Sequence, residues 1–194
     1  MEEMEILRQE VENCQKCPLS ITRNHAVFGD GNPHAHIMII AEGPGYHEDM
    51  QGHTFVGPSG QMLDKILEAC GFRRDEHIFI SNIVRCRPPQ NRAPKPEERE
   101  ACLPYLMRQI ELVDPQIIIL LGATALKGLI YPDARITQMR GQWIHWNGRL
   151  VMPTYHPSAL LRNPNMKRPV WEDMKLVVAK YRELVDADHY SAHC

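Results

Sequence analysis

The sequence predicts an α/β fold, a three-layer α/β/α sandwich around a central, mostly parallel four-stranded sheet. Short apolar runs that suit buried strands alternate along the chain with segments of helical spacing. The run over residues 116–121 is almost entirely apolar, as expected of a central parallel strand. A length of 194 residues is enough to bury one core without staples, so we expect a single domain over residues 1–194.

The first half of the chain predicts two helices and two strands. Apolar residues at helical spacing, from Met4 to Val11, indicate a first helix. Ser59 is a suitable N-cap for a second helix, and Gly71 is a suitable residue to close it. The elements expected here are a helix that ends before residue 14, a strand over 36–40, a helix over 59–71 and a strand over 78–84.

The second half continues the alternation. Pro96 is well placed at the start of a helix, because its missing N–H is not needed there. Asn147-Gly148, between two apolar segments, is a strong signal for a two-residue hairpin turn. The elements expected here are helices over 97–112, 123–129 and 170–185, a strand over 116–121 and a hairpin over 143–152. The tail over residues 186–194 is expected to be disordered.

Charge and composition exclude a membrane protein. No apolar run approaches the roughly 18 residues that span a bilayer, and the acidic N-terminus does not resemble a signal peptide. We therefore expect an intracellular, cytoplasmic protein. The net charge of −2 does not indicate a nucleic-acid partner. Basic residues nevertheless gather in two loops, over 85–95 (including Arg85) and 162–168, which permits a basic face.

Unusual residues stand at the carboxyl ends of the predicted strands. These are Glu42 and Gly43, Asn82, Gly122 and His156. Since ligands of open α/β sheets bind at this edge, we expect these residues to line one crevice.

The turn after the first strand has the composition of a pocket for a flat polar ring. Gly43 and Gly45 allow close approach of the backbone, Pro44 stiffens the turn, and Glu48 and Phe55 add an acid and an aromatic face. An ordinary strand-to-helix loop is the alternative interpretation.

Four cysteines suggest a metal site. Cys14 and Cys17 form a C-x-x-C pair, and Cys86 and Cys102 form a second pair separated by fifteen residues. The paired spacing usual in zinc ribbons is absent, which favours a [4Fe-4S] cluster over zinc, with unliganded buried thiols as a third interpretation. Such a site would tie the N-terminal helix to the loop after Cys86.

Four motifs together resemble the family 4 uracil-DNA glycosylases. They are CQKCPL, AEGPGYHEDMQGHTFVGPSGQMLD, NIVRCRPPQNRAPKPEE and HPSALLR, in this order from Cys14 onward. The resemblance implies the uracil-DNA glycosylase fold and a [4Fe-4S] cluster on Cys14, Cys17, Cys86 and Cys102. It implies hydrolysis of the N-glycosidic bond of deoxyuridine in single- or double-stranded DNA, which leaves free uracil and an abasic site without strand cleavage.

Three residues are candidates for binding a flipped uracil. Phe55 is suited to stack on the ring. Asn82 offers a donor and an acceptor that match uracil O4 and N3–H. Glu48 lies where the resemblance places a side chain against uracil C5, so it would exclude the methyl group of thymine.

The catalytic candidates are His156, Glu42 and Gly43. His156 would donate a hydrogen bond to uracil O2 as negative charge grows on the leaving base. Glu42 would favour the cationic sugar, and the amides of Glu42 and Gly43 can face O2. Gly43 stands where family 1 enzymes carry a water-activating aspartate, so we expect a dissociative route. The family's first turn glycine is Ala41 here.

DNA contacts are expected around the crevice. The resemblance places Leu160 as an apolar wedge in the minor groove. Candidates for phosphate contacts are Ser158, Arg162, Arg87, Arg92 and Lys95. We expect a monomer, without an evident docking peptide for a sliding clamp. Two alternatives are a non-catalytic, cluster-containing module that binds uracil-containing DNA and a zinc-stabilised hydrolase of unrelated substrate.

Overall fold

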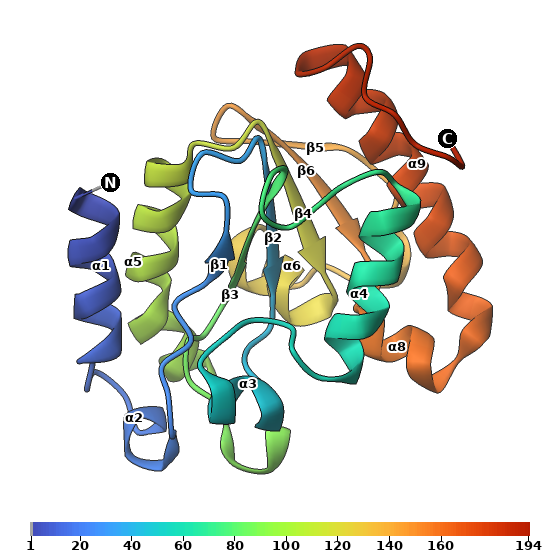
Figure 1. The fold of residues 1–194 in the computed structure, drawn as a ribbon. Coiled ribbons are helices and arrows are strands. Elements are labelled where there is room, and N and C mark those ends of the chain that lie inside the picture. Colours follow the sequence, from blue (N-terminus) through green and yellow to red (C-terminus); the bar gives the residue numbers. More distant parts are fainter. Residues whose placement is uncertain (1) are drawn as a thin grey trace.

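A six-stranded sheet forms the centre of the protein in the computed structural model, which describes residues 2–194 (Figure 1). The strands lie in the order β1-β3-β2-β4-β6-β5. Their bounds are β1 Asp30–Gly31, β2 Ile37–Ala41, β3 Ile78–Asn82, β4 Ile117–Leu121, β5 Ile144–Trp146 and β6 Arg149–Thr154.

The four inner strands, β3, β2, β4 and β6, run parallel to one another. Every residue of β2, β3 and β4 is buried, which explains why their sequences are apolar runs rather than alternating patterns. The predicted mostly parallel four-stranded sheet is confirmed. Two short strands, β1 and β5, extend it at the edges by antiparallel pairing.

Helices cover both faces of the sheet (Figure 1). Met38 and Ile40 of β2 point into one core layer, while Ile37 and Ile39 point into the other. The first layer is covered by α1 (Glu2–Glu12), α5 (Pro96–Val113) and α6 (Ala123–Leu129). The second is covered by α4 (Pro58–Ala69), α8 (Pro157–Arg162) and α9 (Lys167–Leu184). This is the predicted α/β/α sandwich.

Short helices occupy the connections. They are α2 (Leu19–Thr22), α3 (Tyr46–Gln51), α7 (Ile136–Met139) and two 3-10 turns, η1 (Pro89–Asn91) and η2 (Pro164–Met166). Helices α2, α3, α7 and α8 were not predicted from the sequence, because four to six residues are too few to show a period. Helix α4 begins earlier than predicted, because Gly57 rather than Ser59 is the N-cap and Pro58 opens the helix.

The hairpin between β5 and β6 forms where it was predicted. Asn147 and Gly148 have φ values of 45° and 75°, and two consecutive left-handed residues are the mark of a type I′ turn. No helix within residues 2–194 has both the length and the apolar character needed to cross a bilayer.

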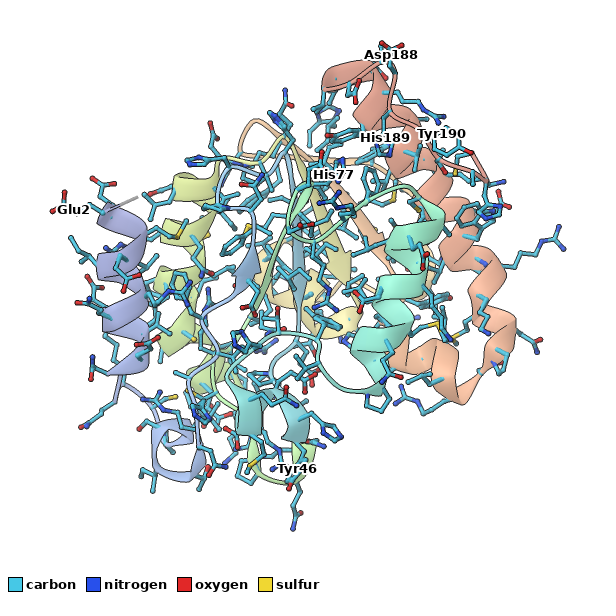
Figure 2. All side chains as sticks on the ribbon, viewed as in Figure 1. Glu2, Tyr46, His77, Asp188, His189 and Tyr190 are labelled. Carbon is cyan, nitrogen blue, oxygen red and sulfur yellow. The ribbon has the colours of Figure 1, made fainter. Side chains whose placement is uncertain are left out.

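The C-terminal tail is packed against the body, so the expectation of disorder is wrong. His189 is 6% exposed and hydrogen-bonds through Nε2 to the carbonyl of Cys70. Its ring stacks on Phe72 with 4.6 Å between the centroids. Figure 2 shows His189 and Tyr190 beside the C-terminal end of α9. The stacked and hydrogen-bonded ring of His189 therefore anchors the tail, which the polar sequence of the tail did not indicate.

Candidate active site

A crevice of about 610 Å³ opens at the carboxyl edge of the parallel strands. Residues at or after the ends of β2, β3, β4 and β6 line it, as the strand order predicted. Most of the site residues expected from the sequence are in its wall: Glu42, Gly43, Glu48, Phe55, Asn82, Arg92, His156, Ser158 and Arg162.

The side-chain amide of Asn82 is buried in this wall with its oxygen unpartnered. Asn82 ends β3 and is 3% exposed. Within residues 2–194, no donor reaches its Oδ1 atom. Buried polar atoms without partners are rare in proteins. The amide oxygen is therefore an acceptor available to an N–H group of a ligand.

Three backbone N–H groups fix the carboxylate of Glu48. Its Oε1 atom accepts from Val56 and Gly57, each at 3.1 Å, and Oε2 accepts from Gly45 at 3.2 Å. Charge-assisted bonds of this kind hold a side chain in one rotamer. Glu48 therefore presents a fixed, negatively charged surface to the crevice.

Glu42 is held by Thr124, a residue that the sequence does not mark as part of the site. Its Oε2 atom accepts a hydrogen bond from the hydroxyl of Thr124, the second residue of α6. Strand β4 pairs with β2, and α6 begins directly after β4. The start of α6 therefore lies beside the turn that follows β2. The carboxylate of Glu42 is oriented by that contact.

A side chain at Gly43 would collide with Val84. A Cβ atom added there would come within 2.8 Å of Val84 Cγ2. This position therefore cannot hold a water-activating carboxylate unless Val84 moves.

The aromatic ring of Phe55 faces the imidazole of His156. Their centroids are 5.7 Å apart and their planes differ by 28°. Phe55 has a φ of 50°, an unusual value for a bulky residue. Arg74 supports this conformation by donating to the carbonyls of Thr54 at 3.0 Å and Phe55 at 2.8 Å. Strained backbone held in this way is frequent at functional sites.

The imidazole of His156 is neutral at pH 7 and has a defined tautomer. Burial lowers the pKa of His156 to about 4; the charge of Arg162 acts in the same direction and that of Glu48 opposes it. Its Nδ1 atom accepts from the backbone N–H of Ser158 at 3.0 Å and lies 2.8 Å from the Ser158 hydroxyl. Since Nδ1 is an acceptor, the proton of the neutral ring is on Nε2.

Leu160 does not fit the role of a DNA wedge. Its side chain is 2% exposed and packs in the core layer that α4, α8 and α9 cover. The next residue, Leu161, is 46% exposed. The correction follows from the short helix α8, which turns Leu160 toward the sheet and Leu161 toward solvent.

The basic loop residues have different surroundings. Arg92 forms a 2.7 Å ion pair with Glu98, which is 2% exposed. Arg87 lies outside the crevice wall, with its guanidinium carbon 5.3 Å from the ring centroid of Tyr46. Figure 2 shows Tyr46 at the outer edge of α3. Lys95 is exposed and outside the wall.

A comparison with known protein families identifies the fold. Residues 28–175 match the family model described as Uracil DNA glycosylase superfamily, and that span carries every crevice residue named above. The chain belongs to the uracil-DNA glycosylase superfamily.

Relatives place this glycosylase in the type-4 family. A type-4 uracil-DNA glycosylase of Thermotoga maritima is 44% identical over 178 residues, which are 89% of this chain and 91% of that protein. Those of Sulfurisphaera tokodaii and Saccharolobus solfataricus are each 42% identical. The alignments cover 95% and 91% of this chain and 86% of each relative.

The four cysteines of this glycosylase line one small cavity between α1, α2 and α5. In the described part of the chain, no group of three or more His, Cys, Asp or Glu side chains is arranged to hold a metal ion.

The surroundings of the cavity suit an anionic group. Arg23 donates to Cys86 Sγ at 3.0 Å from one side. Arg85, which is 1% exposed, lines the same cavity and has an unpartnered Nε atom among the residues that the structure describes. Burial lowers the pKa of Arg85, while the neighbouring Cys102 and Cys86 oppose that change. The residues present therefore fit a cluster held by four thiolates.

Proposed function

We propose that this uracil-DNA glycosylase binds an extruded uracil in the crevice and hydrolyses its N-glycosidic bond. The observation that carries the proposal is the buried, unpartnered Oδ1 atom of Asn82. It matches the N3–H group of uracil, while the amide nitrogen matches O4. Cytosine has an acceptor at N3 and a donor at N4, so it would face the same amide with mismatched groups. A mismatch of this kind at a buried site reduces the rate by about 10⁴–10⁵.

Glu48 excludes thymine in this proposal. Its carboxylate is fixed by three N–H groups and therefore cannot swing away from a methyl group on C5. Phe55 provides the stacking surface for the ring. Uracil is then distinguished from cytosine by Asn82 and from thymine by Glu48.

His156 stabilises the leaving base. The neutral ring donates from Nε2 to uracil O2, where negative charge accumulates as the C1′–N1 bond breaks. A neutral donor does this without proton transfer, and loss of one such donor typically costs about 2.7–4 kcal/mol. The depressed pKa of His156 ensures that the neutral form is present across the physiological range.

The bond breaks before water attacks. No carboxylate stands at Gly43 to activate water, and Val84 leaves no room for one. Glu42, oriented by Thr124, stabilises the cationic sugar. Water then adds to C1′ and loses a proton, which neutralises the released uracil anion, so that free uracil and the abasic site are formed. Charge stabilisation on both fragments replaces general-base catalysis.

Arg162 and the loop around Arg87 and Lys95 contact the DNA phosphates. Arg162 lies in the crevice wall, while Arg87 and Lys95 lie outside it, on the loop that places Arg92 in the wall. Arg92 contributes less than predicted from sequence, because Glu98 already neutralises its charge. The hydroxyl of Ser158 hydrogen-bonds to His156 rather than to a phosphate. Leu161, not Leu160, is the exposed leucine of α8, and it precedes the crevice residue Arg162 in the sequence.

Cys14, Cys17, Cys86 and Cys102 would hold a [4Fe-4S] cluster. In this place the cluster supplies structural cross-linking and local charge. The four ligands tie the segment after α1 to the end of β3 and to α5, and so anchor the loop that carries Arg87. We propose that the protein is a single domain and acts on genomic DNA as a monomer in the cytoplasm.

The test is uracil release from a labelled oligonucleotide. Purified, iron-loaded protein should release free uracil and leave an alkali-labile abasic site in single- and double-stranded substrates, without cutting the strand. Matched oligonucleotides with cytosine or thymine in place of uracil should remain intact. Absence of uracil release by folded protein would refute the proposal. Binding to uracil-containing DNA without turnover would instead support the non-catalytic alternative.

A further inference from the structure

Arg85 is a buried cation between the cysteine cavity and the uracil-reading end of β3. It is 1% exposed, and it lines the cavity together with Cys86 and Cys102. A buried guanidinium is strongly destabilising unless its donors and its charge are both compensated. The sequence places Arg85 in a basic loop, where exposure is expected, so its burial requires an explanation.

The donors of Arg85 reach neutral groups. Nη1 donates to the backbone carbonyl of Asn82 at 2.6 Å, and Nη2 donates to the amide oxygen of Gln109. Gln109 also accepts from the Ser81 hydroxyl at 2.6 Å and donates to the Phe28 carbonyl at 2.8 Å. These contacts connect α5 to the last two residues of β3.

The charge of Arg85 is not balanced by a carboxylate. Over residues 2–194, no ion pair includes it, and its Nε atom has no partner. The groups beside it that can become negative are the thiols of the cavity. Four thiolates around a cluster carry a net negative charge, and Arg85 and Arg23, which both line the cavity, supply two cations.

We propose that Arg85 is a positioning residue that couples the four-cysteine site to uracil recognition. Its charge balances the ligated cysteines, and its Nη1 atom holds the carbonyl of Asn82, so that the adjacent side-chain amide keeps the orientation needed to read uracil. The inference rests on the proposed cluster and on the proposed role of Asn82. In this proposal, the cluster affects the active site through the Arg85 side chain and the end of β3 at Asn82.

Two substitutions separate the charge of Arg85 from its geometry. Arg85→Met removes the charge at similar length. Arg85→Lys keeps the charge, but an ammonium group lacks the two planar N–H arms that donate to the Asn82 carbonyl and to the Gln109 amide oxygen. The control is Arg108→Met, which removes an arginine of α5 that is 44% exposed and paired with Glu10 on the surface. All are made in the full chain and compared with wild type.

Four quantities are measured: iron and sulfide content, the reduction potential of the cluster, single-turnover uracil release and affinity for an uncleavable uracil analogue in DNA. Arg85→Met should shift the potential to a more negative value, because a cation next to the cluster is lost. It should lower the rate about tenfold to a hundredfold through misplacement of Asn82. Arg85→Lys should keep the wild-type potential and still lose rate. Arg108→Met should change none of these.

An Arg85→Met protein that loads iron with unchanged potential and unchanged rate would overturn the inference. If Arg85→Met fails to load iron, the Arg85→Lys variant tests the inference. That variant must load iron, keep the wild-type reduction potential and release uracil more slowly, and any other result overturns the coupling. A wild-type protein without iron or without uracil release would instead contradict the proposed function, so the two failures are distinguishable.

Discussion

The hydroxyl of Thr124 donates a hydrogen bond to the carboxylate of Glu42, and this contact joins residues 82 positions apart in the sequence. It orients the acid that we assign to the cationic sugar. Hydrogen bonds to charged groups contribute about 1.5–3 kcal/mol. Thr124→Val, which keeps the shape and removes the hydroxyl, should therefore lower single-turnover uracil release by about tenfold or more.

Thr124→Ser is the matched control for this prediction. It keeps the hydroxyl and loses only a methyl group, so its rate should stay within about threefold of wild type. Quench-flow measurement of uracil release at saturating enzyme gives both rates. Equal rates for the valine and serine variants would show that the hydrogen bond does not orient Glu42 for catalysis.

A methyl group added at Gly43 would meet Val84 Cγ2 at 2.8 Å, which predicts a steric conflict. Gly43→Ala should lower the free energy of unfolding by about 1–3 kcal/mol, as expected for overpacking. Val84→Ala removes the opposing methyl groups and should offset part of that loss in the double variant. Urea unfolding of the four proteins measures the coupling. Strictly additive effects would mean that Gly43 is not restricted by Val84.

Much of the fold could be predicted because its signals are local. The continuous apolar runs of β2 and β4 indicated buried parallel strands, and Asn147-Gly148 fixed the hairpin. The crevice followed from strand order, since Asn82 and His156 come at the carboxyl ends of parallel strands. Such inferences need only a short apolar run or a turn residue.

The remaining features depend on contacts between distant segments. Leu160 and Leu161 are adjacent leucines in a six-residue helix, and only packing shows which of them is buried. Arg85 stands in a basic loop and has no local signal for burial. Its contact with Gln109 requires α5 to lie against β3. The residues of the crevice could therefore be identified from sequence more readily than the residues that hold them.

The pKa of His156 makes a prediction about pH. Because the pKa is lowered to about 4, the ring should remain neutral and active from pH 8 to about pH 5, and its contribution should be lost only as the pH approaches 4. An unperturbed histidine would titrate near 6.5. Long-range ¹H–¹⁵N NMR should show the Nε2–H tautomer at pH 7. Removal of the repelling cation in Arg162→Met should raise the pKa and move the acid limb of the profile to higher pH.

The same pKa affects stability. Between about pH 6.5 and pH 4 the unfolded chain binds a proton at His156 that the folded protein does not, so stability falls as the pH is lowered through this window. His156→Gln should reduce that slope. A wild-type rate profile with an ionisation near pH 6.5, abolished by His156→Gln, would contradict the buried neutral ring.

Glu48 predicts a change in specificity. Glu48→Ala removes the side chain that we place against uracil C5, so the variant should release thymine from a T·G mismatch at a measurable rate. It also leaves the N–H groups of Gly45, Val56 and Gly57 without their acceptor, which should lower the free energy of unfolding by about 1–3 kcal/mol. Glu48→Gln keeps the bulk and should still exclude thymine. An alanine variant that releases uracil but no thymine would remove Glu48 from specificity.

The docked C-terminal tail predicts a stability effect without a catalytic one. His189 stacks on Phe72 and hydrogen-bonds to Cys70, at the opposite end of the sheet from Tyr46 (Figure 2). His189→Ala should lower the free energy of unfolding by about 1–3 kcal/mol and leave uracil release unchanged. His189→Phe keeps the stacked ring and loses only the hydrogen bond, so its loss should be smaller. His34→Ala, at an exposed position outside the tail, is the control and should be nearly neutral. Urea unfolding measures all three, and a His189→Ala protein as stable as wild type would show that the tail adds nothing to the fold.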